Sequence, residues 1–170
     1  VSEISDSKPM QSAPSSERVH IAIFGRCNAG KSTLINRLTG QDVAIVSPVA
    51  GTTTDPVQKA MEINGLGAAI LIDTPGLDDT TTLGAERTAR SAKVLDKTDI
   101  AIILFTDAEG REERRMMEEC RIKEIPTVVA LAHIDTMCDS ESVRAELERN
   151  IGQKAIAISA LTGEGIEELL

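Results

Sequence analysis

The sequence predicts an α/β fold: a doubly wound, mostly parallel six-stranded sheet with one antiparallel edge strand and helices on both faces. Three observations lead to this prediction. Short apolar runs rich in β-branched residues recur along the chain, most of them are continuous rather than alternating, and segments with helical periodicity separate them. Continuous apolar runs are typical of strands buried on both faces of a parallel sheet, and strand–helix alternation is typical of doubly wound folds.

The chain has 170 residues, about the size of one domain, and its first part differs from the rest. Residues 1–17 contain six serines, two prolines and no apolar periodicity. We therefore expect a disordered tail or linker over 1–17 and one folded domain over 18–170.

Six strands are expected. Five of them are continuous apolar runs over residues 19–24, 68–72, 100–105, 127–131 and 155–158. The sixth covers 57–63, partly alternates, and precedes Asn64-Gly65, a dipeptide typical of hairpin turns. This segment is therefore predicted to be the antiparallel edge strand, paired with 68–72.

Helical segments fill the gaps between the strands. Three leucine and isoleucine side chains share one face of a predicted helix over 32–39, which ends at Gly40. Further helices are predicted over 86–95, 111–124 and 140–150, the last with Asp139 or Ser140 as its N-cap. A final helix is expected to begin near Glu164 and is truncated at the end of the chain.

Composition excludes several classes of protein. Phe24 and Phe105 are the only Phe, Tyr or Trp residues, so the base-stacking platforms of single-strand binders are absent. The net charge of −9 argues against nucleic acid or anionic lipid as partners. No apolar run approaches the roughly 20 residues that span a bilayer, and no signal peptide is visible. The three cysteines have no paired spacing, so they are expected to be small buried or half-buried residues in a cytoplasmic or organelle-stroma protein.

The strongest motif is Gly25-Arg-Cys-Asn-Ala-Gly-Lys-Ser32, which matches the phosphate-loop pattern G-x-x-x-x-G-K-[ST] between a predicted strand and a predicted helix. Its glycines let the backbone curl so that amides point at phosphates. Lys31 is predicted to pair with the β- and γ-phosphates, and the Ser32 hydroxyl to bind Mg²⁺. The predicted phosphate-binding residues are Asn28, Ala29, Gly30, Lys31, Ser32 and Thr33. The motif alone does not separate ATPases, kinases and GTPases.

Two further motifs are predicted to serve the metal ion and the γ-phosphate. Asp73 follows a strand and begins Asp73-Thr-Pro-Gly76, where it can hold a Mg²⁺-bound water while the Gly76 amide senses the γ-phosphate. Thr53, in Gly51-Thr-Thr-Thr-Asp55, is predicted to complete the Mg²⁺ shell and to couple loop order to the γ-phosphate. A polar surface turn is the alternative interpretation of this threonine run.

Base recognition is expected at two later strand ends. The predicted base-site residues are His133, Asp135, Ser159, Ala160 and Leu161. The Asp135 carboxylate can accept hydrogen bonds from guanine N1–H and the exocyclic amine, whereas adenine lacks this pair of donors. The Ala160 amide is expected to donate to guanine O6, and His133 to stack on the base. Guanine is therefore the predicted base.

Together these motifs resemble those of the translation-factor-like GTPases with a potassium-activated branch, over residues 19–170. More narrowly, Gly51-Thr-Thr-Thr-Asp-Pro-Val-Gln-Lys-Ala-Met-Glu62 and Leu71-Ile-Asp-Thr-Pro-Gly-Leu-Asp-Asp79, with Leu83-Gly84, resemble the iron–iron hydrogenase H-cluster maturation GTPases, the HydF family. The resemblance implies a P-loop NTPase fold, the Ras-like G domain. It also implies a homodimeric scaffold that carries a cluster precursor and exchanges it with radical-SAM maturases and hydrogenase.

The resemblance implies further residue roles. Asn28 stands where potassium-dependent members have a K⁺-ligating asparagine, so K⁺ is implied as a cofactor beside GTP or GDP and Mg²⁺. Leu77 stands where a Ras-like GTPase has its water-orienting glutamine, and leucine cannot polarise water, so slow turnover is expected. Glu86 roughly matches an acidic residue that acts through water in the tRNA-modifying relatives, although an ordinary helix-surface glutamate is the simpler interpretation. The predicted catalytic residues are Lys31, Thr53, Gly76 and Glu86.

Two features depart from the family pattern. The base motif Asn-Lys-x-Asp reads Ala132-His133-Ile134-Asp135, and loss of the asparagine is expected to remove a tie to the phosphate loop and weaken nucleotide binding. The chain has two histidines and no Cys-x-x-Cys, so the family's iron–sulfur ligands are expected outside it. The predicted function is a GTP-hydrolysing regulatory domain of a hydrogenase maturation scaffold. A guanine-nucleotide switch with negligible hydrolysis and a tRNA-modification or ribosome-assembly GTPase are the alternatives.

Overall fold

A computed structural model describes residues 18–40, 57–78 and 84–170, and for 84–88 it describes the backbone alone. The predicted tail over 1–17 and the threonine run that contains Thr53 lie outside the described residues. The strands are β1 (Val19–Gly25), β2 (Gln58–Ile63), β3 (Gly67–Asp73), β4 (Ile100–Phe105), β5 (Thr127–Leu131) and β6 (Ile156–Ala157). The helices are α1 (Lys31–Gly40), α2 (Gly84–Leu95), α3 (Arg111–Ile122), α4 (Ser140–Ile151) and α5 (Ile166–Leu169), with a 3-10 turn η2 (Ile134–Thr136).

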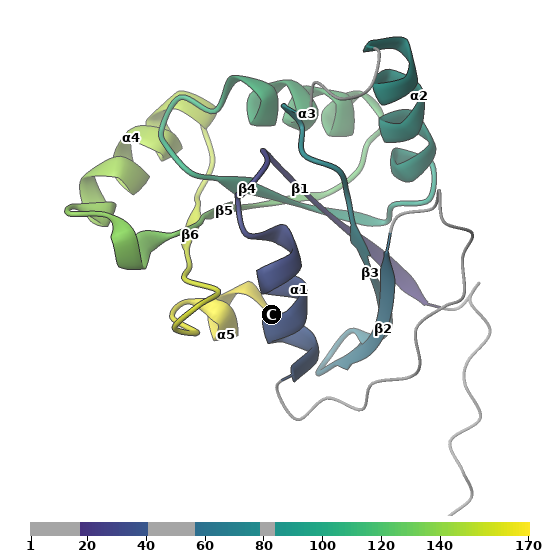
Figure 1. Cartoon of the computed structure of the whole chain (residues 1–170), viewed down its shortest axis with the longest axis horizontal. Helices are drawn as coiled ribbons and strands as arrows, with labels where there is room; N and C mark the ends of the chain where they lie inside the picture. Colours follow the sequence, from purple (N-terminus) through teal and green to yellow (C-terminus); the bar gives the residue numbers. More distant parts are fainter. Residues whose placement is uncertain (1–17, 41–56, 79–83) are drawn as a thin grey trace, which may run out of the picture.

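The strands form one twisted sheet in the order β2-β3-β1-β4-β5-β6 (Figure 1). The edge strand β2 runs antiparallel to β3, and every other neighbouring pair is parallel. The predicted fold class, including the single antiparallel edge strand, is therefore confirmed. The phosphate loop and Asp73 meet at one edge of this sheet because the carboxyl ends of parallel strands lie together.

Helices cover both faces of the sheet (Figure 1). Side chains of α1 and α5 pack with Ile21 and Ile23 of β1 on one face. Side chains of α2, α3 and α4 pack with Ala22 and Phe24 on the other face. Successive β1 residues thus enter opposite cores, which explains why this strand reads as a continuous apolar run rather than an alternating one.

The ends of several elements differ from the prediction. The helix predicted over 111–124 ends at Ile122, and Glu124 adopts a positive φ of 57° that leaves the helix. The final helix begins at Ile166 rather than near Glu164, because Gly165 turns the chain with a φ of 73°. The α4 N-cap is Asp139, whose side chain accepts a hydrogen bond from the Ser142 amide at 3.1 Å.

The cysteine prediction is correct for one residue and wrong for two. Cys120 is fully buried on the inner side of α3, whereas Cys27 and Cys138 are exposed. Cys27 lies in the phosphate loop and Cys138 in the segment that precedes α4, so neither packs inside a core. Among the described residues, no helix has the length and apolarity needed to cross a membrane.

Candidate functional site

The loop from Gly25 to Ser32 joins β1 to α1 and is shaped by tight turns. Asn28 and Gly30 have positive φ values of 62° and 89°. Gly25 is closely enclosed, because a Cβ there would lie 3.0 Å from the Leu104 carbonyl of β4. The Ala29 amide donates to Arg26 O at 3.2 Å, so this predicted phosphate donor is engaged in the loop's own turn.

Lys31 begins α1, and its side chain turns back over the loop. Its ammonium Nζ donates to Gly25 O at 3.0 Å and to Arg26 O at 2.7 Å. Desolvation by burial lowers the pKa of Lys31, while the nearby charge of Asp73 opposes this shift. The loop carbonyls therefore hold the ammonium beside the position expected for the phosphates.

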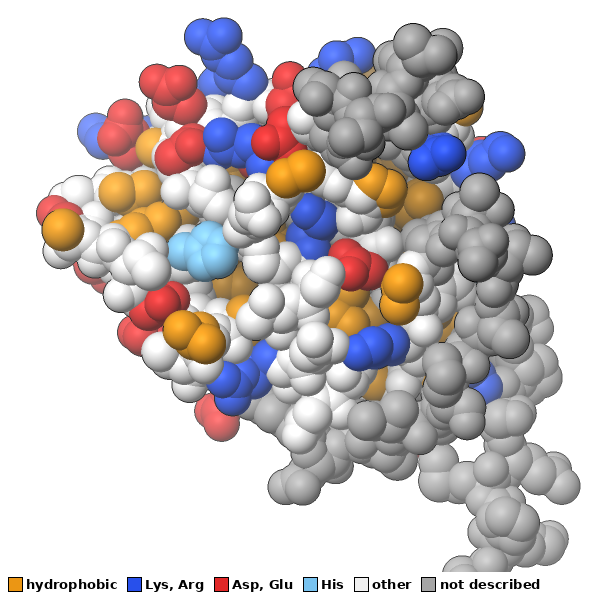
Figure 2. Space-filling view, viewed as in Figure 1, with side chains coloured by type: hydrophobic (Ala, Val, Ile, Leu, Met, Phe, Trp, Pro, Cys, Tyr) orange, Lys and Arg blue, Asp and Glu red, His pale blue; other side chains and the backbone are white. Residues whose placement is uncertain are grey.

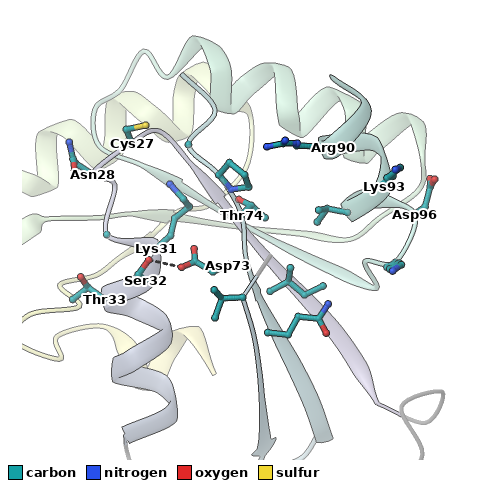
Figure 3. A pocket seen from close by; sticks show the side chains of 18 of the residues that line it. Cys27, Asn28, Lys31, Ser32, Thr33, Asp73, Thr74, Arg90, Lys93 and Asp96 are labelled. Atoms are coloured by element: carbon teal, nitrogen blue, oxygen red, sulfur yellow. Dashed lines mark hydrogen bonds between the residues drawn. The ribbon is translucent and has the colours of Figure 1, made fainter. Parts of the chain in front are cut away.

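Ser32 and Asp73 form an oxygen pair next to Lys31. Asp73 ends β3, and its Oδ2 accepts a hydrogen bond from Ser32 Oγ at 2.5 Å (Figure 3). Thr74 anchors the chain that follows, because its Oγ1 donates to Ile23 O of β1 at 2.6 Å. A hydroxyl and a carboxylate in contact are the donor types that Mg²⁺ prefers, so this pair fits the predicted metal site.

The segment that follows β3 lies directly on the phosphate loop. Gly76 touches Cys27, since a Cβ on Gly76 would lie 2.3 Å from the Cys27 sulfur. The Leu77 amide donates to Gly25 O at 3.1 Å, and Asp78 Oδ1 accepts from the Cys27 amide at 2.5 Å. Partial desolvation raises the pKa of Asp78, but the hydrogen bonds from Cys27 outweigh it and the net pKa is lowered. Asp78 thus stays a carboxylate that binds the loop.

His133 ties the loop after β5 to the phosphate loop. Its Nε2 lies 2.9 Å from Asn28 O, and a Cβ on Gly30 would lie 3.4 Å from its ring. Loss of the motif asparagine was expected to remove a contact between this loop and the phosphate loop. The contact between His133 and Asn28 O replaces it. Asp135 lies two residues further on, in η2, and is exposed.

The loop after β6 is held by its own hydrogen bonds and by α1. Ser159 is buried, and its Oγ accepts from the Thr162 amide at 3.1 Å. Arg37 of α1 donates from Nε to Ala160 O at 2.9 Å and also binds Leu161 O. Ala160 and Leu161 thus present their carbonyls to Arg37, while the Leu161 side chain is exposed.

A cavity of about 1440 Å³ lies along the phosphate loop, the end of β3 and the inner side of α2 (Figure 3). Of the predicted site residues it brings together Asn28, Gly30, Lys31, Ser32, Thr33, Asp73, Gly76 and His133. It does not include Ala29, Asp135, Ser159, Ala160 or Leu161. Ala29 packs into the core, and the other four belong to the loops after β5 and β6, beyond His133.

Two predicted catalytic residues cannot be placed in this geometry. Thr53 lies outside the described residues, and Glu86 lies in α2 where the backbone alone is described. Arg37 and Asp78 also contact the site, although neither was among the predicted site residues. Arg37 carries no motif, and the acidic run after Leu77 was the single sequence signal for Asp78.

Comparison with known proteins assigns the family. Residues 20–133, two thirds of the chain, match the family described as 50S ribosome-binding GTPase. The chain belongs to this family. It is a P-loop GTPase domain of the TrmE-Era-EngA type, and the family implies binding of GTP or GDP with Mg²⁺ and hydrolysis of GTP.

Individual relatives agree with this family. The GTPase domain is 38% identical over 161 residues to the tRNA modification GTPase MnmE of Aquifex aeolicus, covering 90% of this chain and 33% of that protein. It is 34% identical to MnmE of Nitrosomonas europaea with the same two coverages. The chain therefore spans about a third of the length of the MnmE proteins that it matches.

Two solved structures resemble the domain. Era of Aquifex aeolicus, bound to GDP and AlF₄⁻, superposes with a TM-score of 0.68 at 29% identity over 88% of this chain and 54% of that chain. The FeoB G domain of Methanococcus jannaschii superposes with a TM-score of 0.61 at 28% identity over 89% of this chain and 92% of that chain. Both similarities support the G-domain fold of this GTPase domain.

Proposed function

We propose that this chain is the GTP-hydrolysing switch domain of a longer protein, with residues 18–170 forming the domain that binds GTP and Mg²⁺. The observation that carries the proposal is the 2.5 Å contact between Ser32 and Asp73 beside the buried Lys31. These three side chains converge in one cavity at the carboxyl edge of a parallel sheet, where nucleotide phosphates bind in open α/β folds.

In the proposed mechanism each side chain has a separate role. The Lys31 ammonium pairs with the β- and γ-phosphates, and the Ser32 hydroxyl and Thr53 bind the metal ion. With Mg²⁺ bound, the Asp73 carboxylate would hold a water molecule of the ion, and the Gly76 amide would donate to the γ-phosphate. Bound Mg²⁺ supplies positive charge that offsets the charge developing on the phosphates. The side chain of Leu77 packs against the apolar core of α2 and α3, so it does not orient the attacking water.

Another group must therefore compensate for Leu77. We propose that K⁺, bound by the exposed Asn28 side chain, supplies positive charge at the phosphates. We also propose that Glu86 contributes to hydrolysis through a water molecule. We expect slow hydrolysis as a result. A guanine-nucleotide switch with negligible hydrolysis is the second candidate, and the specific observation that favours it is again Leu77.

Guanine recognition is assigned to the loops after β5 and β6. Asp135 accepts from the guanine N1–H and amine, while the Ala160 amide donates to O6. The exposure of Asp135 leaves a purine room to approach the carboxylate. His133, which contacts Asn28 O, keeps this loop next to the phosphate loop.

Calorimetry and turnover measurements test the proposal. In millimolar Mg²⁺, GTP and GDP are expected to bind, and ATP is expected not to bind. If ATP bound as tightly as GTP, the assignment of guanine as the recognised base would be overturned. Single-turnover GTP hydrolysis is then compared in KCl and in NaCl at equal ionic strength. Faster hydrolysis in KCl, lost in Asn28→Ala, supports the K⁺ role. Equal rates overturn that role, and no phosphate release over hours favours the non-hydrolysing switch.

The longer protein has two candidate roles, each favoured by a different observation. The named relatives are tRNA modification GTPases, and this similarity favours tRNA modification. The run from Asp55 to Glu62 favours hydrogenase H-cluster maturation, since this run resembles that family. In the described part of the face in Figure 2, acidic and basic side chains are interspersed, so this face lacks the broad basic area typical of an RNA-binding surface.

Deletion of the gene for the longer protein separates the two roles. In the deletion strain, tRNA nucleoside composition and hydrogenase activity are measured side by side. Loss of modified nucleosides with normal hydrogenase supports tRNA modification. Loss of hydrogenase activity with normal tRNA supports cluster maturation, and the implied homodimer and exchange with radical-SAM maturases would then be tested by co-purification.

A further inference from the structure

The phosphate loop carries a cation that points away from the nucleotide cavity. The guanidinium of Arg26 donates from Nε to Glu113 Oε1 at 2.8 Å. Its Nη2 donates to Asp107 Oδ2 at 2.5 Å and to Thr106 Oγ1 at 3.0 Å. The hydrogen bond to Asp107 raises the pKa of Arg26 against the opposing effect of burial, so the group stays charged.

Both carboxylate partners of Arg26 are themselves fixed. Glu113 lies in the first turn of α3 with no exposed surface, and its second oxygen Oε2 has no hydrogen-bond partner in the described part of the chain. The ion pair with Arg26 at Oε1, with an Nε–Oε1 distance of 2.8 Å, therefore supplies the positive charge beside this buried carboxylate. Asp107 uses its other oxygen, Oδ1, to accept from the Glu109 and Gly110 amides at 2.9 Å each. The guanidinium is thus anchored to two rigid points at the start of α3.

The backbone of the same residue reaches the catalytic lysine. Arg26 O accepts from Lys31 Nζ at 2.7 Å and from the Ala29 amide at 3.2 Å. Arg26 therefore links α3 on one side with the turn of the loop and the Lys31 ammonium on the other. A shift of this residue would move the carbonyl that accepts both of these hydrogen bonds.

We propose that Arg26 is a positioning residue, which holds the phosphate loop and Lys31 in place for the nucleotide phosphates by anchoring the loop to α3 through Glu113 and Asp107. This inference rests on the proposed GTP site. According to this proposal, α3 influences nucleotide affinity, although no residue of α3 belongs to a sequence motif of the nucleotide site. Displacement of α3 by a partner protein would act on the loop through the same three side chains.

The experiment measures GTP and GDP affinity, kcat and KM of the purified chain. In Arg26→Gln we expect affinity to fall about tenfold, with a corresponding rise in KM and a smaller change in kcat. This variant leaves the fully buried Glu113 without its cation partner, which destabilises a fold. The double variant Arg26→Gln, Glu113→Gln carries no unpaired buried charge, because the remaining Asp107 carboxylate is partly exposed to water. We therefore expect a melting temperature near that of the wild type and the same loss of affinity.

Two further variants complete the design. Asp107→Asn keeps the acceptor for the Glu109 and Gly110 amides but loses the charge that faces Arg26, and we expect a smaller loss of affinity. The matched control changes Glu118 and Arg121 to Gln. That pair lies exposed on the same helix, with an Arg121 Nη2 to Glu118 Oε1 distance of 2.5 Å, and does not contact the loop. Its affinity is expected to stay within about twofold of wild type.

The outcomes are distinguishable. Wild-type affinity in a folded double variant overturns the positioning role. If the double variant does not fold, unchanged affinity in Asp107→Asn overturns it instead. Equal losses in the control and in the Arg26 variants indicate a general effect of α3 charge and likewise overturn it. Absence of GTP binding in the wild-type chain refutes the proposed function rather than this inference.

Discussion

Ser32 Oγ lies 2.5 Å from Asp73 Oδ2, so a hydroxyl at the start of α1 meets a carboxylate at the end of β3. The register of the parallel strands produces this contact, because Ile23 of β1 is paired with Asp73 and the phosphate loop begins two residues later. The charge of this Asp73 carboxylate raises the pKa of the nearby Lys31, against the lowering caused by burial. The two oxygens are therefore preset for a hard divalent cation.

Asp73→Asn is expected to raise the Mg²⁺ concentration for half-maximal GTP binding by about tenfold, which is the effect of losing a group that orients a metal-bound water. A Mg²⁺ titration of nucleotide affinity checks this. Asp96→Asn is the control, because Asp96 lines the same cavity but pairs with Lys123 at 2.6 Å. Equal Mg²⁺ dependence in Asp73→Asn and wild type would place the metal elsewhere.

The sequence was sufficient for the parts of the site that depend on local patterns. The phosphate loop, Asp73 and the succession of strands and helices along the chain follow from runs of neighbouring residues, since a strand, a glycine turn and a helix start are encoded within about ten positions. The antiparallel edge strand was predictable for the same reason, because Asn64-Gly65 marks its hairpin.

The contacts that hold the site together were not predictable in this way. His133 reaches Asn28 across 105 positions, Asp78 reaches Cys27 across 51, and Arg26 reaches Glu113 across 87. Each pair meets only because β1 lies between β3 and β4, and β5 lies next to β4. A single sequence carries no signal for such partners. For this reason the loss of the motif asparagine suggested that a contact between the two loops was absent, whereas His133 provides that contact.

Asp135→Asn is expected to weaken GTP binding between about tenfold and a hundredfold, because the amide nitrogen meets the guanine donors and leaves them unpaired. Xanthine offers an acceptor in place of the amine, so xanthosine triphosphate is expected to bind the variant better than GTP does. Competition calorimetry with both nucleotides measures the preference. Asp139→Asn, at the nearby α4 N-cap, is the control and should keep guanine preference. An unchanged preference in Asp135→Asn would show that the base binds elsewhere.

Gly165 and Gly152 form a matched pair, since both have a φ of 73°. A Cβ on Gly165 would lie 2.0 Å from Ala157 O, whereas a Cβ on Gly152 meets nothing within 4 Å. Gly152→Ala is expected to cost about 1 kcal/mol of unfolding free energy from backbone strain alone. Gly165→Ala is expected to cost about 3 kcal/mol, because the clash adds to the strain. Urea unfolding measures the free energy of unfolding of both variants. Equal losses of this free energy would mean that the backbone around Gly165 moves to accommodate the methyl group at no energetic cost.

Burial raises the pKa of the Cys120 thiol to about 11. The thiol pKa in the unfolded chain is near 9. Between about pH 9 and pH 11 the folded chain therefore keeps the thiol proton, whereas the unfolded chain has lost it. The contribution to stability is fully present below about pH 9 and is lost as the pH rises through 11, by up to about 3 kcal/mol. Urea unfolding of wild type and Cys120→Ala from pH 8 to 11 checks this, and the variant is expected to lose less stability over that range. Cys138→Ala removes an exposed thiol and should follow the wild-type curve. If Cys120→Ala also followed that curve, another group would be responsible for the alkaline loss.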